Sequence, residues 1–339
     1  MKTPSTTHAC ARLLGGLLLA TAALQAQAYS NLVVFGDSLS DSGNNAVLVP
    51  PDPNRVLAGN RDFSTSPYFG SGTYSNGQVW TQYLAPRLGL SATPSLRGGS
   101  NYAFGGSETS KPGPHNPGNG LPNGFPYALN TQLGMFLGNT GGVADPNALY
   151  VVASGGNNVR ASMDAVLGGA DAATEGAKLA GDYARDIGQI VDGLQAAGAR
   201  RIIVWNTPNF GHTPLARSYG AGAAGLATSF SQMMNSALAS RLAGEGVQTF
   251  DIYGLLNQIV DQGPASGFSN LVDACGAPTL GCNPATSLYY DSIHPTTLAH
   301  AKLADAMYAL AVPEPASVAL WALGLGGLAL YRRRVTARA

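Results

Sequence analysis

A serine and an aspartate–histidine pair far apart in the chain carry the side chains needed for nucleophilic catalysis. Ser38 follows Gly36 and Asp37 directly after a short apolar run, and Asp291 precedes His294 by three residues. A turn there would let the Asp291 carboxylate fix the tautomer of the imidazole, which could then accept the Ser38 proton. Taken alone, Ser38 is as readily explained as a helix cap, and an isolated Asp-x-x-His pair is usually part of a surface loop. Together they would support attack of a hydroxyl oxygen on an acyl carbon.

Two blocks between these residues contain glycine and asparagine, which can donate hydrogen bonds to a negatively charged oxygen. The first block is Asn101–Ser107, which includes Gly105 and Gly106, and the second is Ser154–Asn158. Each block alone is unspecific, because a Gly-Gly-Asn sequence is usually only a turn. Their value lies in their order along the chain, between Ser38 and the Asp-x-x-His pair.

The four blocks, in this order, resemble those of the GDSL (SGNH) hydrolases. Gly36–Leu39 and its continuation to Asn45 resemble the signature block of that family, and Asp291–Pro295 resembles its Asp-x-x-His block. The matching blocks extend over nearly the whole region between the two ends of the chain. The resemblance implies that the catalytic triad is Ser38, His294 and Asp291.

The same resemblance implies an oxyanion hole with three donors. These would be the backbone N–H groups of Ser38 and Gly106 and the side-chain amide of Asn157. Gly105 is the alternative to Gly106, because the alignment of this block can slip by one residue. Members of the family often carry Asp where this chain has Asn158, a departure that leaves the donor at Asn157 untouched.

Alternation of buried apolar runs and amphipathic segments predicts an α/β fold with a mostly parallel sheet covered on both faces. The helical repeat is clearest over Lys178–Ala197. The resemblance implies the three-layer, flavodoxin-like arrangement of SGNH hydrolases. Ser38 would then lie at the carboxyl edge of the sheet, where ligands bind, and a helix beginning just after it would direct N–H groups at developing negative charge. The predicted strands are Asn31–Gly36, Leu149–Ala153, Arg201–Trp205 and Val247–Ile252.

Segments 50–77 and 106–128 are rich in Gly, Pro, Asn and Ser and lack periodicity, so we expect them to be loops that border the site. The last predicted helix follows Pro295, a residue suited to the start of a helix. The residues expected to form its apolar face are Leu298, Leu303, Met307 and Leu310.

The cysteines and the net charge argue against a metal-binding or a nucleic-acid-binding protein. Cys275 and Cys282 lie seven residues apart in a Gly- and Pro-rich segment, and we expect them to form a disulfide. Metal binding is disfavoured, because no Cys or His cluster with ligand spacing surrounds them, and we expect no metal or organic cofactor. Charged residues make up 11% of the chain and the formal net charge is zero, so no electrostatic footprint for nucleic acid exists.

Both ends of the chain have the composition of targeting segments. Residues 1–28 combine an apolar run with the sequence Ala26-Gln27-Ala28, which predicts a cleaved signal peptide rather than a membrane-anchoring helix. Residues 29–311 would be the hydrolase domain. The tail, 312–339, contains a short apolar segment followed by three arginines, as expected for a transmembrane segment with a cytoplasmic end.

Val312–Arg334 resembles the PEP-CTERM sorting signal of bacteria that make exopolysaccharide. This resemblance implies an exosortase-type protease as a partner and transient anchoring of the tail in the inner membrane. An ordinary C-terminal anchor is the alternative. Both interpretations place the domain outside the cytoplasm, in the cell envelope or the extracellular space.

The remaining titratable residues near the motifs have simpler interpretations. Asp37 and Asp41 are expected to cap backbone amides rather than to act as bases. His212 follows a predicted strand and could contact substrate, because binding sites gather in loops at strand ends. The histidines interpreted as structural or solvated are His8, His115 and His300.

The sequence therefore predicts an exported serine esterase or lipase that hydrolyses carboxylic esters through an acyl-enzyme. A short-chain or lipid ester is the first substrate hypothesis, and an O-acetyl group on an exopolysaccharide is the second. A non-catalytic surface-binding protein on the same fold is the third. Such a protein would not need the full set of Ser38, Gly106, Asn157, Asp291 and His294.

Overall fold

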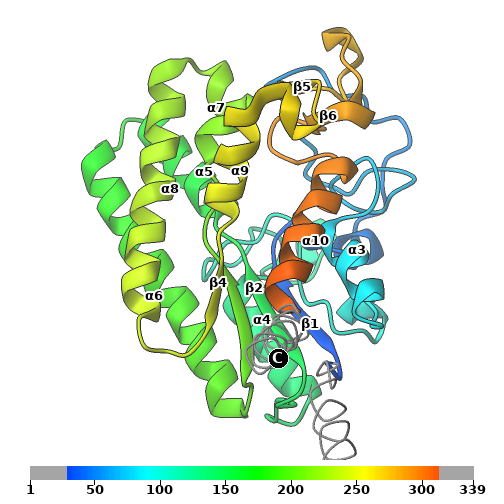
Figure 1. The fold of residues 1–339 in the computed structure, drawn as a ribbon, viewed down its shortest axis with the longest axis vertical. Helices are drawn as coiled ribbons and strands as arrows, with labels where there is room; N and C mark the ends of the chain where they lie inside the picture. Colours follow the sequence, from blue (N-terminus) through cyan, green and yellow to red (C-terminus); the bar gives the residue numbers. More distant parts are fainter. Residues whose placement is uncertain (1–28, 313–339) are drawn as a thin grey trace, which may run out of the picture. The chain divides into compact units, whose positions relative to one another are not determined.

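The computed structural model describes residues 29–312, and Tyr29–Met307 form one compact unit (Figure 1). A second unit comprises Met1–Ala28 and Tyr308–Ala339, of which only residues 308–312 are described. The predicted signal peptide and nearly all of the predicted sorting tail therefore lie outside the described residues. Within the described part of the chain, no helix has the length and apolar character needed to cross a membrane.

Four parallel strands form the central sheet in the order β1–β2–β3–β4. The prediction for β2 and β3 has the observed bounds, whereas β4 is shorter than expected. The physical reason is that the Asp251 side chain accepts a hydrogen bond from the Gly254 amide and begins the next helix at Ile252. The strands are β1 (Leu32–Gly36), β2 (Leu149–Ala153), β3 (Arg201–Trp205) and β4 (Gln248–Phe250).

Helices connect these strands and follow the last of them. The helices of the described residues are α2 (Asn44–Leu48), α3 (Trp80–Arg87), α4 (Leu129–Asn139), α5 (Gly156–Leu167), α6 (Ala172–Ala197), α7 (Pro214–Ser218), α8 (Ala221–Leu242), α9 (Ile252–Gln262) and α10 (Thr297–Ala311).

Apolar side chains cover both faces of the sheet, because successive residues of a strand point to opposite faces. On one face, Phe35 and Tyr150 belong to a core that includes buried residues of α4, α5, α6 and α8. On the other, the ring of Trp205 lies 4.7 Å from that of Trp80 in α3, and its Nε1 lies 3.1 Å from the Met307 sulfur of α10. The predicted α/β fold with helices on both faces is confirmed (Figure 1).

Helix α6 is the long amphipathic segment recognised in the sequence, but it begins at Ala172 rather than at Lys178. Its first turn is capped by Asp171, whose side chain accepts a hydrogen bond from the Thr174 amide. It ends at Gly198, which adopts a left-handed φ of 110°. The additional turns carry few large apolar residues, so periodicity alone did not reveal them.

Helix α10 follows Pro295 as predicted, but only two of the four residues predicted for its apolar face are buried. Leu303 and Met307 are buried, whereas Leu298 and Leu310 are only half-buried. Their places are taken by small residues and by a histidine, which allow the helix to pack closely. These residues are Ala299, His300 and Ala304.

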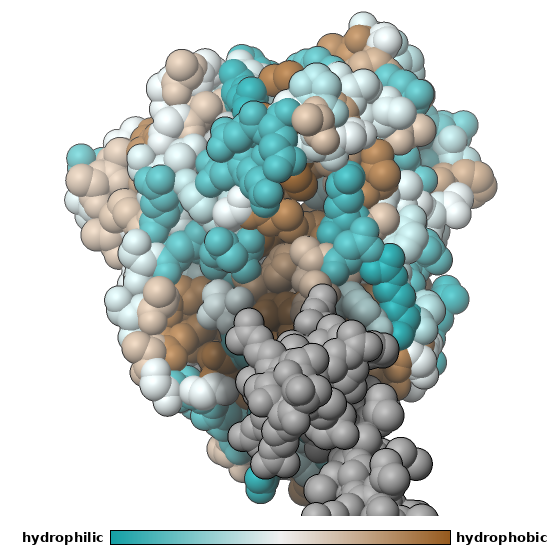
Figure 2. All heavy atoms as spheres, viewed as in Figure 1, coloured by the Kyte–Doolittle hydropathy of each residue, from teal (hydrophilic) through white to brown (hydrophobic). Residues whose placement is uncertain are grey.

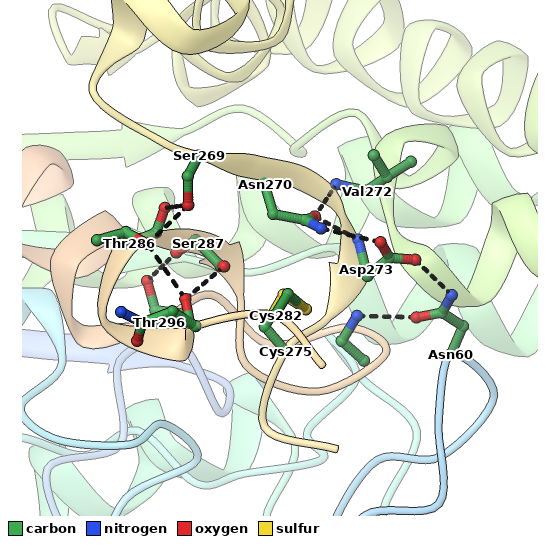
Figure 3. Close-up of a disulfide and its surroundings, with 12 residues drawn as sticks. Asn60, Ser269, Asn270, Val272, Asp273, Cys275, Cys282, Thr286, Ser287 and Thr296 are labelled. Carbon is green, nitrogen blue, oxygen red and sulfur yellow. Dashed lines mark hydrogen bonds between the residues drawn. A yellow bond between two sulfur atoms is a disulfide. The ribbon is translucent and has the colours of Figure 1, made fainter. Parts of the chain in front are cut away.

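A second sheet, which the sequence did not predict, pairs β5 (Asn270–Ala274) with β6 (Ser287–Tyr289). These strands are short and lack a regular apolar alternation, so they carry little signal. Cys275 follows β5 directly and is joined to Cys282 by a disulfide, with a Cα–Cα distance of 5.2 Å (Figure 3).

Loop 50–77 is attached to this second sheet through Asn60 (Figure 3). The Asn60 amide donates to Asp273 Oδ1 at 2.8 Å, and its carbonyl oxygen accepts from the Ala274 amide at 2.8 Å. The disulfide and the loop are thus connected to the same end of β5.

Candidate active site

The carboxyl ends of β1 and β2 bring the first candidate residues to one edge of the sheet. Gly36, the last residue of β1, pairs with Ala153, the last residue of β2. The segments that carry Ser38 and Asn157 therefore leave the sheet side by side. A Cβ at position 36 would lie 2.6 Å from the Ala153 carbonyl oxygen. Only glycine allows this close approach.

Residues 100–104 bring the glycine block to the same edge. They run parallel to β1, with the Tyr102 amide donating to Val34 O at 2.7 Å and the Phe104 amide to Gly36 O at 3.2 Å. Gly105 and Gly106 follow immediately, and both contribute to the wall of a cavity that also contains Ser38.

Ser38 lies in a tight turn, and the prediction of a helix directly after it is wrong. The amides of Ser40 and Asp41 both donate to the Asp37 carbonyl at 3.0 Å, and α2 begins only at Asn44. The helix that starts at this sheet edge is instead α5, whose first turn contains Asn157. The partial positive charge of that helix terminus therefore faces the site.

Ser38, His294 and Asp291 form a continuous chain of hydrogen-bonding contacts. His294 Nε2 lies 2.9 Å from Ser38 Oγ, and His294 Nδ1 lies 2.6 Å from Asp291 Oδ2. Asp291 Oδ1 accepts from the amides of Ile293 at 2.9 Å and His294 at 2.7 Å. Because the carboxylate requires a donor at Nδ1, the lone pair of Nε2 points to the serine hydroxyl.

Tyr68 is a partner of Asp291 that the sequence did not reveal. Its hydroxyl donates to Asp291 Oδ2 at 2.6 Å, the same oxygen that accepts from His294 Nδ1. Burial and the neighbouring carboxylate raise the pKa of Tyr68, which keeps the phenol protonated as a donor. Tyr74, in the same loop, packs its ring 5.2 Å from that of His294.

In the block Asn101–Ser107, the hydrogen bonds favour Gly106 over Gly105 as the backbone donor to the oxyanion. The Gly105 amide already donates to Asp41 Oδ2 at 3.1 Å, whereas the Gly106 amide has no hydrogen-bond acceptor among residues 29–312. Gly106 has a φ of 87°, a conformation that side chains rarely adopt. The Asn157 amide donates one hydrogen to Ser107 O at 3.0 Å, which leaves its second hydrogen for a ligand.

Asn158, where the family often has Asp, has a separate role in holding loop 106–128. Its side-chain amide donates to Thr109 Oγ1 at 3.1 Å, and that hydroxyl in turn donates to the buried Asp186 at 2.7 Å. The loop is therefore fixed to both α5 and α6 next to Asn157.

Asp37 and Asp41 bind backbone amides, as predicted. Asp37 Oδ1 accepts from the Leu39 amide at 3.0 Å, and Asp41 accepts from several amides, including Asn44 at 2.6 Å. Burial raises the pKa of each carboxyl group to about 6, although the amide hydrogen bonds favour the charged form.

The other histidines occupy three different environments. His212 Nε2 lies 2.7 Å from Asn257 Oδ1, and burial lowers the pKa of His212. Because His212 does not line the cavities that contain Ser38, it is not brought to the site. His115 lines one of these cavities, which the structural or solvated interpretation did not anticipate. His300 is buried, and burial lowers its pKa to about 3, so it is structural rather than solvated. His8 lies outside the described residues.

Two cavities share Ser38, Asn157 and His294 in their walls. One, which we call the α9–α10 cavity, has a volume of about 50 Å³ and is lined chiefly by apolar side chains of those two helices and their neighbours. The other, the polar cleft, has a volume of about 230 Å³. Its wall includes residues from loops 50–77 and 106–128, which confirms that these loops border the site.

No group of three or more His, Cys, Asp or Glu side chains within residues 29–312 is placed to hold a metal ion. The expectation that the protein uses no metal or organic cofactor stays a prediction.

Within this α/β fold, Ser38, His294 and Asp291 have the arrangement that a serine nucleophile requires. Residues 32–307 match the family model described as GDSL-like Lipase/Acylhydrolase, and the chain belongs to this family. Residues 311–335 match the PEP-CTERM protein-sorting motif. The chain therefore combines a GDSL domain with a C-terminal sorting signal for export.

Several curated proteins are similar to this chain. Esterase EstA from Pseudomonas aeruginosa is 30% identical over 88% of this chain and 50% of the esterase. Lipase 1 from Photorhabdus luminescens is 32% identical over 59% of this chain and 26% of the lipase. The chain thus spans half or less of the length of these bacterial relatives. Among solved structures, the extracellular lipase from Streptomyces rimosus is 18% identical with a TM-score of 0.42, covering 82% of this chain and 97% of that one.

Proposed function

We propose that this protein is an exported carboxylic ester hydrolase in which Ser38 is the nucleophile, His294 the general base and Asp291 the residue that orients the imidazole. The observation that carries the proposal is the continuous Ser38–His294–Asp291 chain, with contacts of 2.9 Å and 2.6 Å, whose Ser38 and His294 line two cavities. Membership of the GDSL family supports an ester as the substrate class.

In the first step, Ser38 Oγ attacks the acyl carbon while His294 Nε2 takes the hydroxyl proton. A C–O bond forms, and the carbonyl electron pair moves to the oxygen of a tetrahedral intermediate. This intermediate collapses with cleavage of the ester C–O bond, and His294 gives its proton to the departing alcohol oxygen. The product is an acyl-Ser38 ester and a free alcohol.

In the second step, water takes the place of the alcohol. His294 removes a proton from the water as its oxygen attacks the acyl-Ser38 carbon, and the same proton returns to Ser38 Oγ when the acyl–enzyme bond breaks. Asp291 remains a carboxylate throughout and stabilises the imidazolium that forms in each step. A carboxylic acid and the free enzyme are released.

The negative oxygen of each intermediate would be bound by Ser38 N–H, Gly106 N–H and Asn157 Nδ2. The support for this set is that the first two amides have no acceptor within the described part of the chain and that the Asn157 amide keeps one hydrogen free. The first turn of α5 adds its partial positive charge to these donors. Loss of one such donor typically costs about 3 kcal/mol of transition-state stabilisation.

The sorting motif supports a location and a partner. We expect the domain to be delivered to the cell envelope or beyond, and we expect an exosortase-type protease to recognise residues 311–335. Transient anchoring of the tail in the inner membrane would precede this processing.

A second candidate function is O-acetyl ester hydrolysis on an exopolysaccharide. The observation that favours it is the polar cleft, whose wall includes Asn45, Ser64 and Arg160 beside Ser38 and is wide enough for a hydroxyl-rich alcohol. Sorting to a surface covered by such polymers is consistent with this substrate.

The test compares the full-length chain with its Ser38→Ala variant on 4-nitrophenyl acetate, on 4-nitrophenyl butyrate and on acetylated xylan. We expect kcat of the variant to fall by about 10⁴-fold or more, as for other triad nucleophiles. A fluorophosphonate should label the native chain and not the variant. A folded native chain that hydrolysed none of these esters and resisted the label would contradict the enzyme proposal and leave the surface-binding alternative.

A further inference from the structure

We infer that the α9–α10 cavity binds the acyl chain of the substrate and limits the enzyme to short, straight acyl groups, while the polar cleft takes the alcohol. This inference rests on the proposed function, because it concerns the two halves of the ester that Ser38 would attack. The cavity begins at Ser38 and His294 and extends between the two helices.

Away from the catalytic residues, the wall of the α9–α10 cavity is built mainly from apolar side chains. Helix α9 is amphipathic and turns three of them inward, and α10 contributes a leucine that is 1% exposed. On the face shown in Figure 2, hydrophobic atoms lie between the positions of these two helices, with hydrophilic residues beside them. The apolar residues that define the cavity are Phe210, Ile252, Leu256, Ile259, Tyr289 and Leu303.

Two polar side chains of this wall that lie outside the catalytic set are already hydrogen-bonded within the protein. Asn209 Nδ2 donates to Asn257 Oδ1 at 2.8 Å, and Thr213 Oγ1 donates to Phe210 O at 2.7 Å. A hydroxyl-rich sugar in this cavity would lose its hydrogen bonds to water without finding replacements, a large penalty. A hydrocarbon chain would lose nothing and would gain from burial.

The volume of the cavity sets the length of the chain. A water-sized group needs roughly 10–15 Å³ of such space, so 50 Å³ holds about three to five methylene-sized groups beyond the reacting carbon. Butyryl and hexanoyl groups fit this limit. A long acyl chain would have to separate α9 from α10 and break the packing of both helices.

The polar cleft has more polar side chains in its wall, mixed with aromatic ones, and this difference decides which half of the ester goes where. It is several times larger, and its wall contains Ser64, Thr65 and Arg160. The guanidinium of Arg160 lies 5.6 Å from the Phe63 ring centre, and its Nε has no partner within residues 29–312. Such a wall can satisfy the hydroxyl groups of a polar alcohol, which the α9–α10 cavity cannot do.

The first experiment varies the two halves of the ester separately, using the full-length native chain. One series consists of 4-nitrophenyl esters from acetate through butyrate, hexanoate and octanoate to dodecanoate, and the other of acetates of ethanol, butanol, hexanol and octanol. We expect kcat/KM to peak at butyrate or hexanoate in the acyl series and to vary little with alcohol length. A peak at dodecanoate, or a sharp optimum in the alcohol series alone, would overturn the inference.

The second experiment changes the cavity wall. Leu256→Trp should lower the ratio of kcat/KM for the hexanoate to kcat/KM for the acetate by about tenfold or more, and Ile259→Ala should move the optimum to a longer ester. Gln258→Trp is the matched control, because this residue lies on the exposed side of the same helix. The control should leave the chain-length profile as it is.

The possible outcomes separate this inference from the proposed function. Activity that depends on Ser38, with a chain-length profile that neither wall variant changes, would reject the cavity and retain the esterase. If Leu256→Trp does not fold, Ile259→Ala decides, and an unchanged optimum in that variant rejects the cavity. A native chain without esterase activity would reject both.

Discussion

Asp291 shares one carboxylate oxygen between His294 and Tyr68, with both contacts at 2.6 Å. We expect Tyr68→Phe to lower kcat by about tenfold, because a hydrogen bond to a charged group is worth about 1.5–3 kcal/mol and its loss frees the carboxylate to move. KM should change little, because Tyr68 contacts Asp291 and not the substrate. A purely structural tyrosine would lower the melting temperature without lowering kcat of the folded protein.

Tyr290→Phe is the matched control for this prediction. Tyr290 packs edge-on against Tyr68 with ring centres 4.8 Å apart, but no hydrogen bond joins its hydroxyl to Asp291. The control should keep the native kcat. If the two variants behaved alike, Tyr68 would have no positioning role.

Asn157 and Asn158 are adjacent, but their amides have different partners. We expect Asn157→Ala to reduce kcat by about 10²–10³-fold with little change in KM, because its free hydrogen would act only on the charged oxygen. Asn158→Asp should keep more of the activity than Asn157→Ala, because the partner of Asn158 is Thr109 and not the charged oxygen. Steady-state kinetics on a 4-nitrophenyl ester would measure both, and equal losses in the two variants would contradict the assignment.

Among single residues of the site, those in recognisable sequence blocks could be predicted, and those in aperiodic loops could not. Ser38, Asp291 and His294 are brought together as expected, and Gly105 is distinguished from Gly106 only by its hydrogen bond to Asp41. Tyr68 lies 223 residues before Asp291. Nothing in its local sequence indicates this contact, which depends on the path of a whole loop.

Among the elements, loop 50–77 carries Tyr68 and is attached through Asn60 to β5, next to the disulfide. We expect the double variant Cys275→Ser/Cys282→Ser to lose about 2–3 kcal/mol of unfolding free energy, from the closure entropy of a short loop. Activity should fall as well, because a looser β5 holds the loop less firmly. Urea unfolding and ester kinetics would measure the two effects.

The matched control for the disulfide is Ser269→Ala, which removes the hydroxyl contacts with Thr286 just before β5 and β6 but leaves the covalent bond. It should cost much less stability than the double variant. An unchanged unfolding free energy in the double variant would mean that packing alone holds this segment.

Periodicity predicted the elements whose side chains follow one simple pattern. The strands β2 and β3 are continuous apolar runs buried on both faces, and α6 has a regular apolar stripe. The short β5 and β6 have no such pattern, because most of β5 is exposed or half-buried and β6 is only three residues long. No helix begins directly after Ser38, because the Asp37 carbonyl accepts hydrogen bonds from the amides of a tight turn. Helix α2 begins only at Asn44, whose amide donates to the Asp41 side chain.

For the molecule as a whole, buried titratable groups make stability depend on pH in opposing ways. Burial raises the pKa of Asp37 and Asp41 to about 6, so the folded state binds protons that the unfolded state releases between about pH 6 and pH 4. These two groups increase stability as pH falls through that range. His300 acts in the opposite direction, because its folded pKa is about 3 and the unfolded chain takes up the proton first.

The opposing signs can be separated by comparing variants at several pH values. We expect the unfolding free energy of the native chain, minus that of His300→Gln, to fall by about 2–3 kcal/mol between pH 6 and pH 4. One proton bound only by the unfolded state is worth about 1.4 kcal/mol per pH unit. Relative to Asp37→Asn, the native chain should gain stability over the same range. Urea unfolding at about pH 4, 5, 6 and 7 would measure both differences. Differences independent of pH would mean that these side chains reach water and titrate alike in the folded and unfolded states.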